Sequence, residues 1–118
     1  EGPGESRRDA VGAVARGLKN MANELGVAVV AASQLARPER GIARKRPDMH
    51  SLKESGEIEA AADVVLLIHR PFVLTLDDAD RDADEIVIAK NRHGIGGPLP
   101  VVFDGSRGRF LERDRRAA

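Results

Sequence analysis

The chain has 118 residues, and its 19 Lys and Arg side chains balance 19 Asp and Glu side chains. This length corresponds to one domain or part of one, because domains usually contain about 100–200 residues. The chain has no cysteine, which excludes disulfide bonds and Cys-ligated metal sites. Its apolar runs are far shorter than the ~20 residues that cross a bilayer, and no secretory segment is evident near the start. We therefore expect a soluble, cytoplasmic protein with no membrane partner.

The net charge of zero conceals a segregation of charge along the chain. Residues 37–46 contain five basic side chains and one acidic one, whereas residues 77–85 contain six acidic side chains and one Arg. Residues 107–116 contain five Arg and two acidic side chains. Because a partner responds to the local field rather than to the total charge, the basic segments leave nucleic-acid binding open. Ordinary solvated loops would explain the same pattern equally well.

The first predicted element is an amphipathic helix that ends before Gly26. Apolar residues recur at offsets of 3, 7, 10, 11 and 14 from Val11, and the last of them is Leu25. A glycine directly afterwards suits the left-handed cap of a helix. Residues 27–32 are then continuously apolar, which is typical of a parallel strand buried on both faces. Residues 36–50, with their Arg-Pro and Gly positions, predict a loop.

A second, shorter helix is expected after this loop. Ser51 and Glu54 have the spacing of a capping box. Ser55 and Gly56 are expected to interrupt the helix before it resumes over residues 57–62.

The rest of the chain predicts mainly strands. The expected elements are a buried strand at 64–68, an acidic surface loop at 75–84, a third strand at 85–89, and an antiparallel hairpin formed by 99–103 and 107–111 around an Asp-Gly turn. The resulting fold class is α/β, with a mostly parallel sheet flanked by helices and a C-terminal antiparallel hairpin.

Several motifs of enzyme sites are absent from the sequence. It contains no G-x-x-x-x-G-K-[ST] phosphate-binding loop and no G-x-S-x-G nucleophile motif. The glycines of residues 94–97 lie between two expected strands, so they are not a dinucleotide-binding fingerprint. The three histidines, His50, His69 and His93, lack the spacing of metal ligands, and no metal site is expected within the chain.

The pair Ser33-Gln34 follows a predicted buried strand. Ligands of open α/β sheets bind beyond the carboxyl ends of the strands. A neutral amide at such a place can orient a water molecule or contact a phosphate oxygen. A glutamine there can equally satisfy backbone groups at the strand end.

A second candidate is the segment Lys53-Glu54-Ser55-Gly56. Lys53 and the backbone amides near Gly56 could contact phosphates, and a glycine allows close backbone approach. The competing interpretation is structural, because Glu54 sits three residues after Ser51 and would complete its helix cap.

The third candidate comprises Lys90 and Arg92 at the end of a predicted strand. At the turn beyond the strand, the two cations can converge on one anion. The planar guanidinium binds phosphate bidentately and remains charged. An arginine supplied to a neighbouring subunit's nucleotide stabilises the charge of phosphoryl transfer. A solvated strand end is the alternative.

Taken in order, these stretches resemble a known family. The quoted stretches are Leu18–Leu25, Val29–Leu35, Arg46-Pro47, Leu52–Glu59 running into Ala62-Asp63, Arg70, Lys90–Gly94, and the aromatic residues Phe103 and Phe110. They resemble the C-terminal half of the RecA-like motor domain (a P-loop NTPase fold) of DnaB-type replicative DNA helicases. The likeness runs over roughly residues 8–111.

The resemblance implies roles for the three candidates. Gln34 matches the glutamine that couples the γ-phosphate to the DNA-binding loops. Lys53, Glu54 and Gly56 match the loop that tracks single-stranded DNA. Arg92 and Lys90 match the arginine finger and its companion lysine.

The resemblance also implies an assembly and its cofactors. Such helicases are homohexamers that use ATP and Mg²⁺, translocate on single-stranded DNA, and work with a primase and a helicase loader. The motifs that bind ATP and Mg²⁺ are absent here, residues 1–8 resemble a linker, and residues 112–118 read as a basic tail. We therefore expect a piece of a longer protein or a truncated gene product, which alone does not hydrolyse ATP.

Two rival interpretations stay open at this point. A RecA-like ATPase of the branch-migration type also carries a Lys-Asn-Arg stretch. A non-catalytic module could instead use the basic segment 37–46 and the Arg-rich tail to bind nucleic acid or a protein partner.

Overall fold

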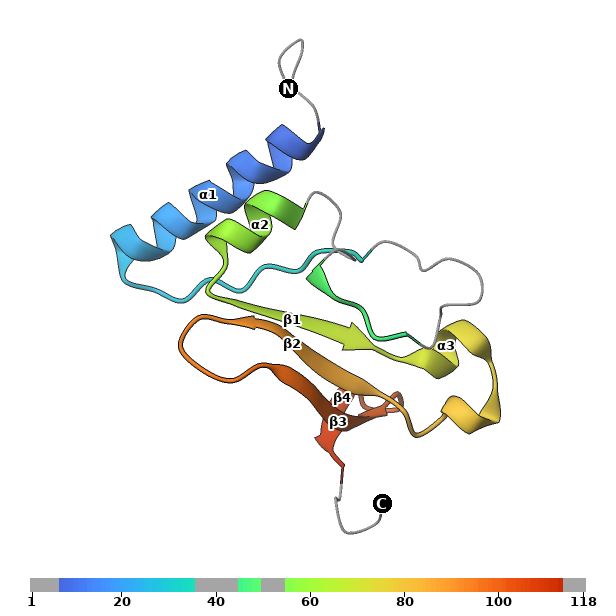
Figure 1. Ribbon diagram of the computed structural model, residues 1–118. Helices are drawn as coiled ribbons and strands as arrows, with labels where there is room; N and C mark the ends of the chain where they lie inside the picture. Colours follow the sequence, from blue (N-terminus) through green and yellow to red (C-terminus); the bar gives the residue numbers. More distant parts are fainter. Residues whose placement is uncertain (1–6, 36–44, 50–54, 114–118) are drawn as a thin grey trace.

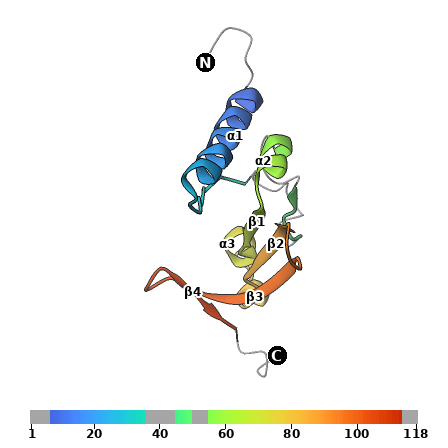
Figure 2. The ribbon, with the colours of Figure 1, turned by 90° about the vertical axis from the view of Figure 1, so that its left-hand side faces the viewer.

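The computed structural model describes residues 7–35, 45–49 and 55–113 (Figure 1). The elements in chain order are α1 (Arg7–Leu25), α2 (Ser55–Ala61), β1 (Val64–His69), α3 (Pro71–Thr75), the 3₁₀ turn η2 (Asp78–Asp80), β2 (Glu85–Asn91), β3 (Gly97–Asp104) and β4 (Arg109–Glu112). The helices α1 and α2 lie side by side near β1, while β3 and β4 lie farthest from them (Figure 2). No helix in the described ranges is both long and apolar enough to cross a bilayer.

The helix α1 confirms the predicted amphipathic helix and its glycine cap. Gly26 adopts a left-handed backbone with φ of 64°. The amide of Val27 donates to the carbonyl oxygen of Ala22 at 3.1 Å, which closes the helix in the manner of a Schellman motif. The glycine is needed because a side chain would disfavour this conformation.

A close approach between α1 and α2 depends on Gly12. A Cβ atom at Gly12 would lie 2.7 Å from the Cγ atom of Glu57. The side chain of Glu57 is also bound by Arg16, one turn farther along α1, whose Nη1 donates to its Oε2 at 2.8 Å. The two helices therefore pack at a distance that a larger residue at position 12 would not permit.

The strand predicted at residues 27–32 is not formed. This segment has no regular secondary structure, and the side chain of Val30 is 97% exposed. A strand needs backbone partners as well as apolar side chains. The four described strands take their ladder partners from one another. Leu35, at the end of the segment, does pack against the core.

The sheet has the order β1-β2-β3-β4 and is antiparallel between all neighbours, so the expected mostly parallel sheet is wrong. Parallel neighbours need a crossover of a dozen or more residues, usually with a helix packed on the sheet. Here residues 92–96 join β2 to β3 directly. Residues 70–84 join β1 to β2 through two short helical turns that reverse the chain.

The predicted terminal hairpin is confirmed by β3 and β4. Phe103 pairs with Phe110 across the ladder, and their ring centroids lie 4.9 Å apart. The guanidinium of Arg70, which follows β1, lies 4.3 Å from the centre of the Phe103 ring. A cation over an aromatic face is attracted by the ring quadrupole, so this contact ties the end of β1 to the hairpin.

The core lies on one face of β1 and β2. It consists of Val65, Leu67 and Val87, and the partly buried side chains of Leu35, Met49, Ile58, Ala62 and Ala89 pack against it. Burial alternates along β1, with Val64, Leu66 and Ile68 on the opposite face and about half exposed. Because both faces of β1 are apolar in sequence, the run resembled a strand buried on both sides.

The acidic segment is less open than the predicted surface loop. Asp80 and Asp84 are buried. The hydroxyl of Thr75 donates to Oδ2 of Asp80 at 2.6 Å, and Nε of Arg70 donates to Oδ2 of Asp84 at 3.3 Å. Two carboxylates of the acidic segment are thus buried and bound to neighbouring side chains.

The alternation of β1 gives a stability test. Leu67 is 2% exposed, whereas Leu66, its neighbour in sequence, is 57% exposed. Leu67→Ala should lower the free energy of unfolding by about 2–4 kcal/mol because it leaves a cavity in the core. The matched control Leu66→Ala should cost less than about 1 kcal/mol. Urea unfolding followed by circular dichroism measures both, and equal losses would contradict the assigned core face.

Candidate functional site

Asp63, between α2 and β1, binds two cations from different elements. Its Oδ1 accepts from Nη1 of Arg92 at 2.6 Å, and its Oδ2 accepts from Nζ of Lys19 at 2.6 Å. The backbone carbonyl of Asp63 also accepts from the amide of Arg92 at 2.9 Å. One residue therefore joins α1, the start of β1 and the end of β2.

The pKa of Asp63 is lowered from its ordinary value. The hydrogen bond from Lys19 is the main cause, and the charges of Lys19, Arg92 and His93 act in the same direction against a smaller effect of desolvation. A carboxylate that accepts charged hydrogen bonds prefers its ionised form. Asp63 is therefore a fixed negative charge between two fixed positive ones.

Lys90 lies on the same strand end and contacts α2. Its Nζ donates to the backbone carbonyl oxygen of Glu59, in the second half of α2. The last carbonyls of a helix lack intrahelical partners and attract cations. Lys90 thus contacts α2, and Arg92, just beyond β2, contacts the residue that precedes β1. Their convergence on one anion stays a prediction.

The other predicted site residues are placed differently. Gly56 lies in the first turn of α2, which runs uninterrupted from Ser55, so the break expected at these residues is absent. Gln34 is exposed in the irregular segment before Leu35, and no described contact joins it to Arg92. Lys53 and Glu54 lie outside the described residues.

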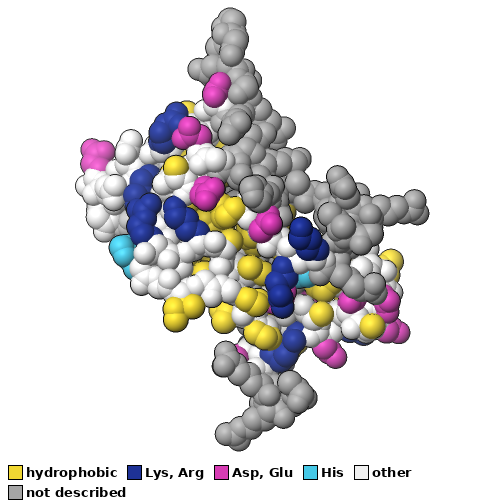
Figure 3. All heavy atoms as spheres, in the orientation of Figure 1, with side chains coloured by type: hydrophobic (Ala, Val, Ile, Leu, Met, Phe, Trp, Pro, Cys, Tyr) yellow, Lys and Arg dark blue, Asp and Glu magenta, His cyan; other side chains and the backbone are white. Residues whose placement is uncertain are grey.

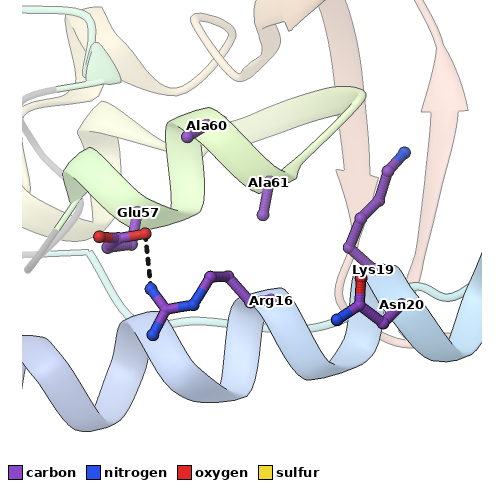
Figure 4. A pocket seen from close by; sticks show the side chains of 6 residues that line it. All are labelled: Arg16, Lys19, Asn20, Glu57, Ala60 and Ala61. Atoms are coloured by element: carbon purple, nitrogen blue, oxygen red, sulfur yellow. Dashed lines mark hydrogen bonds and ion pairs between the residues drawn. The ribbon is translucent and has the colours of Figure 1, made fainter.

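A shallow hollow of about 210 Å³ separates α1 from α2. Its lining residues are Arg16, Lys19, Asn20, Glu57, Ala60 and Ala61 (Figure 4). Both cations of this lining are already paired, Arg16 with Glu57 and Lys19 with Asp63. The hollow therefore offers no unpaired cation to an anionic ligand.

A second ionic group fixes the segment 45–49 to the sheet. Oε1 of Glu85 accepts from Nε of Arg46 at 2.6 Å and lies 3.2 Å from Nδ1 of the buried His69. Burial alone would raise the pKa of Glu85, but the hydrogen bonds from Arg46 and His69 outweigh it, and the pKa is lowered. Arg46, which sequence analysis placed in a basic loop, is thus paired with a carboxylate of the same chain.

Charge and apolar surface are arranged side by side. On one face, apolar side chains gather in the middle and groups of Lys and Arg flank them (Figure 3). Within the described ranges no group of His, Asp and Glu is arranged to hold a metal ion. Arg113, assigned to the basic tail, follows β4, and its side chain donates to the carbonyl oxygens of Asp84 and Val101.

One protein family matches the chain over almost its whole length. A family model of the DnaB-like helicase C-terminal domain matches residues 1–112. The chain belongs to this family. The match favours a DnaB-like domain over an ATPase of the branch-migration type.

Relatives of the DnaB-like family agree along almost the whole chain. The replicative DNA helicase DnaB of Geobacillus stearothermophilus is 38% identical over 112 residues, which is 95% of this chain and 25% of that helicase. DnaB of Mycobacterium leprae is 42% identical over 94% of this chain and 18% of its own length. The chain thus spans about a fifth to a quarter of the length of the curated relatives it matches.

Solved DnaB-like structures share the fold. A DnaB-like replicative helicase, described together with its interactions with primase, superposes with a TM-score of 0.80 at 31% identity and covers 97% of this chain and 27% of its own. A second solved structure, that of an ATPase domain, gives a TM-score of 0.79 at 31% identity, covering 96% of this chain and 40% of its own. The antiparallel sheet described above is therefore a part of the DnaB-like ATPase fold.

Sequence reasoning missed Asp63 and Lys19 as members of the site. Both lie in stretches that resemble the family, but neither has a motif that signals a charge pair across 44 residues. The only available signal was that Asp63 directly precedes a strand whose neighbour ends in two cations.

The lowered pKa of Glu85 gives a pH test. A carboxylate with a lowered folded-state pKa stabilises the fold above its unfolded value of 4.5. That stability is lost as the pH falls through the folded pKa. Glu85→Gln should therefore reduce stability at pH 7 and flatten its fall between about pH 5 and pH 3. Urea midpoints across this range test it, with the exposed Asp78→Asn as control, and an unchanged slope would contradict the ionic role of Glu85.

Proposed function

We propose that this chain is the part of an ATP-dependent replicative DNA helicase that carries its DNA-contacting loop and its arginine finger. In this proposal the complete helicase translocates on single-stranded DNA and unwinds the duplex ahead of it. The family match over residues 1–112 carries the proposal. The paired cations at the end of β2 add support from geometry.

The arginine finger is assigned to Arg92. Its side chain is 42% exposed, so it can reach beyond its own chain. A guanidinium has five N–H donors, and the bond to Asp63 uses one of its nitrogens, which leaves donors for phosphate oxygens. In the proposal Arg92 stabilises the charge that develops on the γ-phosphate of ATP bound by the adjacent subunit. Lys90 is its companion cation.

DNA contact is assigned to the segment that enters α2. Lys53, Glu54 and Gly56 correspond to the family loop that tracks single-stranded DNA. Gly56 is exposed in the first turn of α2, where a residue without a side chain allows a sugar–phosphate backbone to approach closely. The carbonyl of Glu59 on the same helix accepts a hydrogen bond from Lys90, so α2 connects the proposed DNA loop to the companion cation of the finger.

The nucleotide itself is assigned to parts outside this chain. Gln34 is proposed to respond to the γ-phosphate, and its exposure leaves its amide accessible. In the proposal ATP and Mg²⁺ are held by the remaining parts of the motor domain and complete the phosphoryl-transfer site. The isolated chain is accordingly expected to be inactive as an ATPase.

The proposed assembly is a homohexameric ring. A finger that serves a neighbour's nucleotide requires adjacent subunits, and a closed ring of identical subunits supplies one neighbour to each. Primase is the proposed partner, since the matched DnaB-like helicase is described with its interactions with primase. A helicase loader is proposed from the family resemblance alone.

Substitution of Arg92 tests the finger. A chimera, in which residues 1–112 replace the matching quarter of the Geobacillus stearothermophilus helicase, provides a complete motor. Arg92→Ala should lower DNA-stimulated ATP turnover by about 10³-fold or more and leave ATP binding near normal, because only transition-state charge stabilisation is lost. The exposed Arg107→Ala is the control. Wild-type turnover in Arg92→Ala would remove the assignment.

Substitution of Lys53 separates the helicase loop from the binding-module alternative. If Lys53 contacts a phosphate, Lys53→Ala in the chimera should weaken single-strand binding and reduce its salt slope by about one contact. Lys45→Ala, in the basic segment 37–46, should leave the slope unchanged. The opposite result, with only Lys45→Ala reducing the slope, would favour the basic segment as the nucleic-acid contact.

A further inference from the structure

Arg92 is fixed at two points by one residue. The backbone amide of Arg92 donates a hydrogen bond to the backbone carbonyl of Asp63 at 2.9 Å. The guanidinium of Arg92 donates a second one to the carboxylate of Asp63 at 2.6 Å. The first bond sets where the side chain starts, and the second sets where its charged end lies. Arg92 lies just beyond β2, so the ladder between β1 and β2 does not by itself restrain it.

An exposed arginine without such a partner explores many rotamers. Arginine loses a large rotamer entropy when it is ordered, and a finger must be ordered when the transition state forms. Ordering it beforehand removes this cost from the reaction step. The carboxylate of Asp63 is suited to the task because it binds one nitrogen and leaves the other donors of the guanidinium available.

The second cation prevents Asp63 from cancelling the charge of Arg92. Lys19 takes the other carboxylate oxygen at 2.6 Å, so the group of Lys19, Asp63 and Arg92 keeps a net positive charge. Lys90, anchored on the carbonyl of Glu59, adds a further positive charge. A phosphate that approaches Arg92 therefore meets an attractive field although the guanidinium is already paired.

We propose that Asp63 is the positioning residue of the arginine finger: it holds Arg92 extended toward the adjacent subunit's nucleotide, while Lys19 offsets its negative charge. This proposal rests on the proposed function, since it assigns Asp63 to the reaction that Arg92 serves. Asp63 itself contacts no substrate and acts through Arg92.

Asp63→Asn in the chimera is the principal test. The amide keeps the size of the side chain but loses the charge that binds Arg92. DNA-stimulated kcat should fall about 10- to 100-fold, the range expected when a catalytic group is misplaced, and KM for ATP should stay within about 2-fold. An unchanged or raised kcat would overturn the proposal. Asp78→Asn, which removes a carboxylate from an exposed ion pair of the same 2.6 Å length, should leave kcat unchanged.

Lys19→Met separates the finger from the attachment of α1. If Asp63 acts through Arg92, loss of Lys19 should lower kcat clearly less than Asp63→Asn does, because the bond from Arg92 to Oδ1 remains and only the offset of the Asp63 charge is lost. If Lys19→Met lowers kcat as strongly as Asp63→Asn, the carboxylate works by holding α1 and the proposal is wrong. Size-exclusion chromatography and circular dichroism establish that each variant assembles. Should Asp63→Asn fail to assemble, Asp63→Glu, which keeps the charge but displaces it, must still lower kcat at unchanged KM.

A mixing experiment distinguishes this proposal from the finger assignment itself. Subunits with a disabled phosphate-binding loop but wild-type Asp63 and Arg92 are added to Asp63→Asn subunits or to Arg92→Ala subunits. Rescue of both shows that each residue acts on the neighbour's nucleotide. If Arg92→Ala is rescued but Asp63→Asn shows no loss of turnover in the first place, the role of Asp63 is overturned and the finger assignment of Arg92 stands. Failure to rescue Arg92→Ala overturns the finger and, with it, the proposed function.

Discussion

The ionic contacts of Asp63 join the elements that carry the candidate site. Lys19 of α1 and Arg92 after β2 meet on its two carboxylate oxygens, each at 2.6 Å. The contacts are partly exposed, so their contribution to stability is small compared with that of the core. Their importance is geometric, because they fix the orientation of a long side chain that local backbone structure leaves free. The fold places the residues near one another, and the charges then select one arrangement.

The sequence predicted those parts of the fold that depend on local signals. The helix that ends before Gly26 and the hairpin that pairs Phe103 with Phe110 were both predicted from periodicity and turn residues. The sheet direction was not, because apolar residues on both faces of β1 imitate a strand of a parallel sheet. The strand predicted at residues 27–32 was wrong for a related reason. Apolar character predicts burial, whereas a strand requires a ladder partner that composition cannot reveal.

Sequence analysis proposed two cations of the candidate site but missed the carboxylate that binds one of them. Lys90 and Arg92 were proposed because cations after a strand have a recognisable chemistry, and their role stays a prediction. Asp63 was missed because its role depends on contacts with residues 44 positions before it and 29 positions after it. Charge pairs between distant segments are set by tertiary structure, and a single sequence holds no pattern that reports them. The sequence pattern therefore pointed to Arg92 but not to Asp63, its partner in the ion pair.

The close packing at Gly12 has a mechanical consequence. Arg16 and Glu57 link α1 to α2 at 2.8 Å just where the missing Cβ lets the helices approach, and α2 in turn holds Lys90 through the carbonyl of Glu59. A side chain at position 12 would act as a wedge whose displacement passes along α2 to the end of β2. The spacing between α1 and α2 thus affects the position of Lys90, a cation on a different element. The glycine at position 12 sets that spacing.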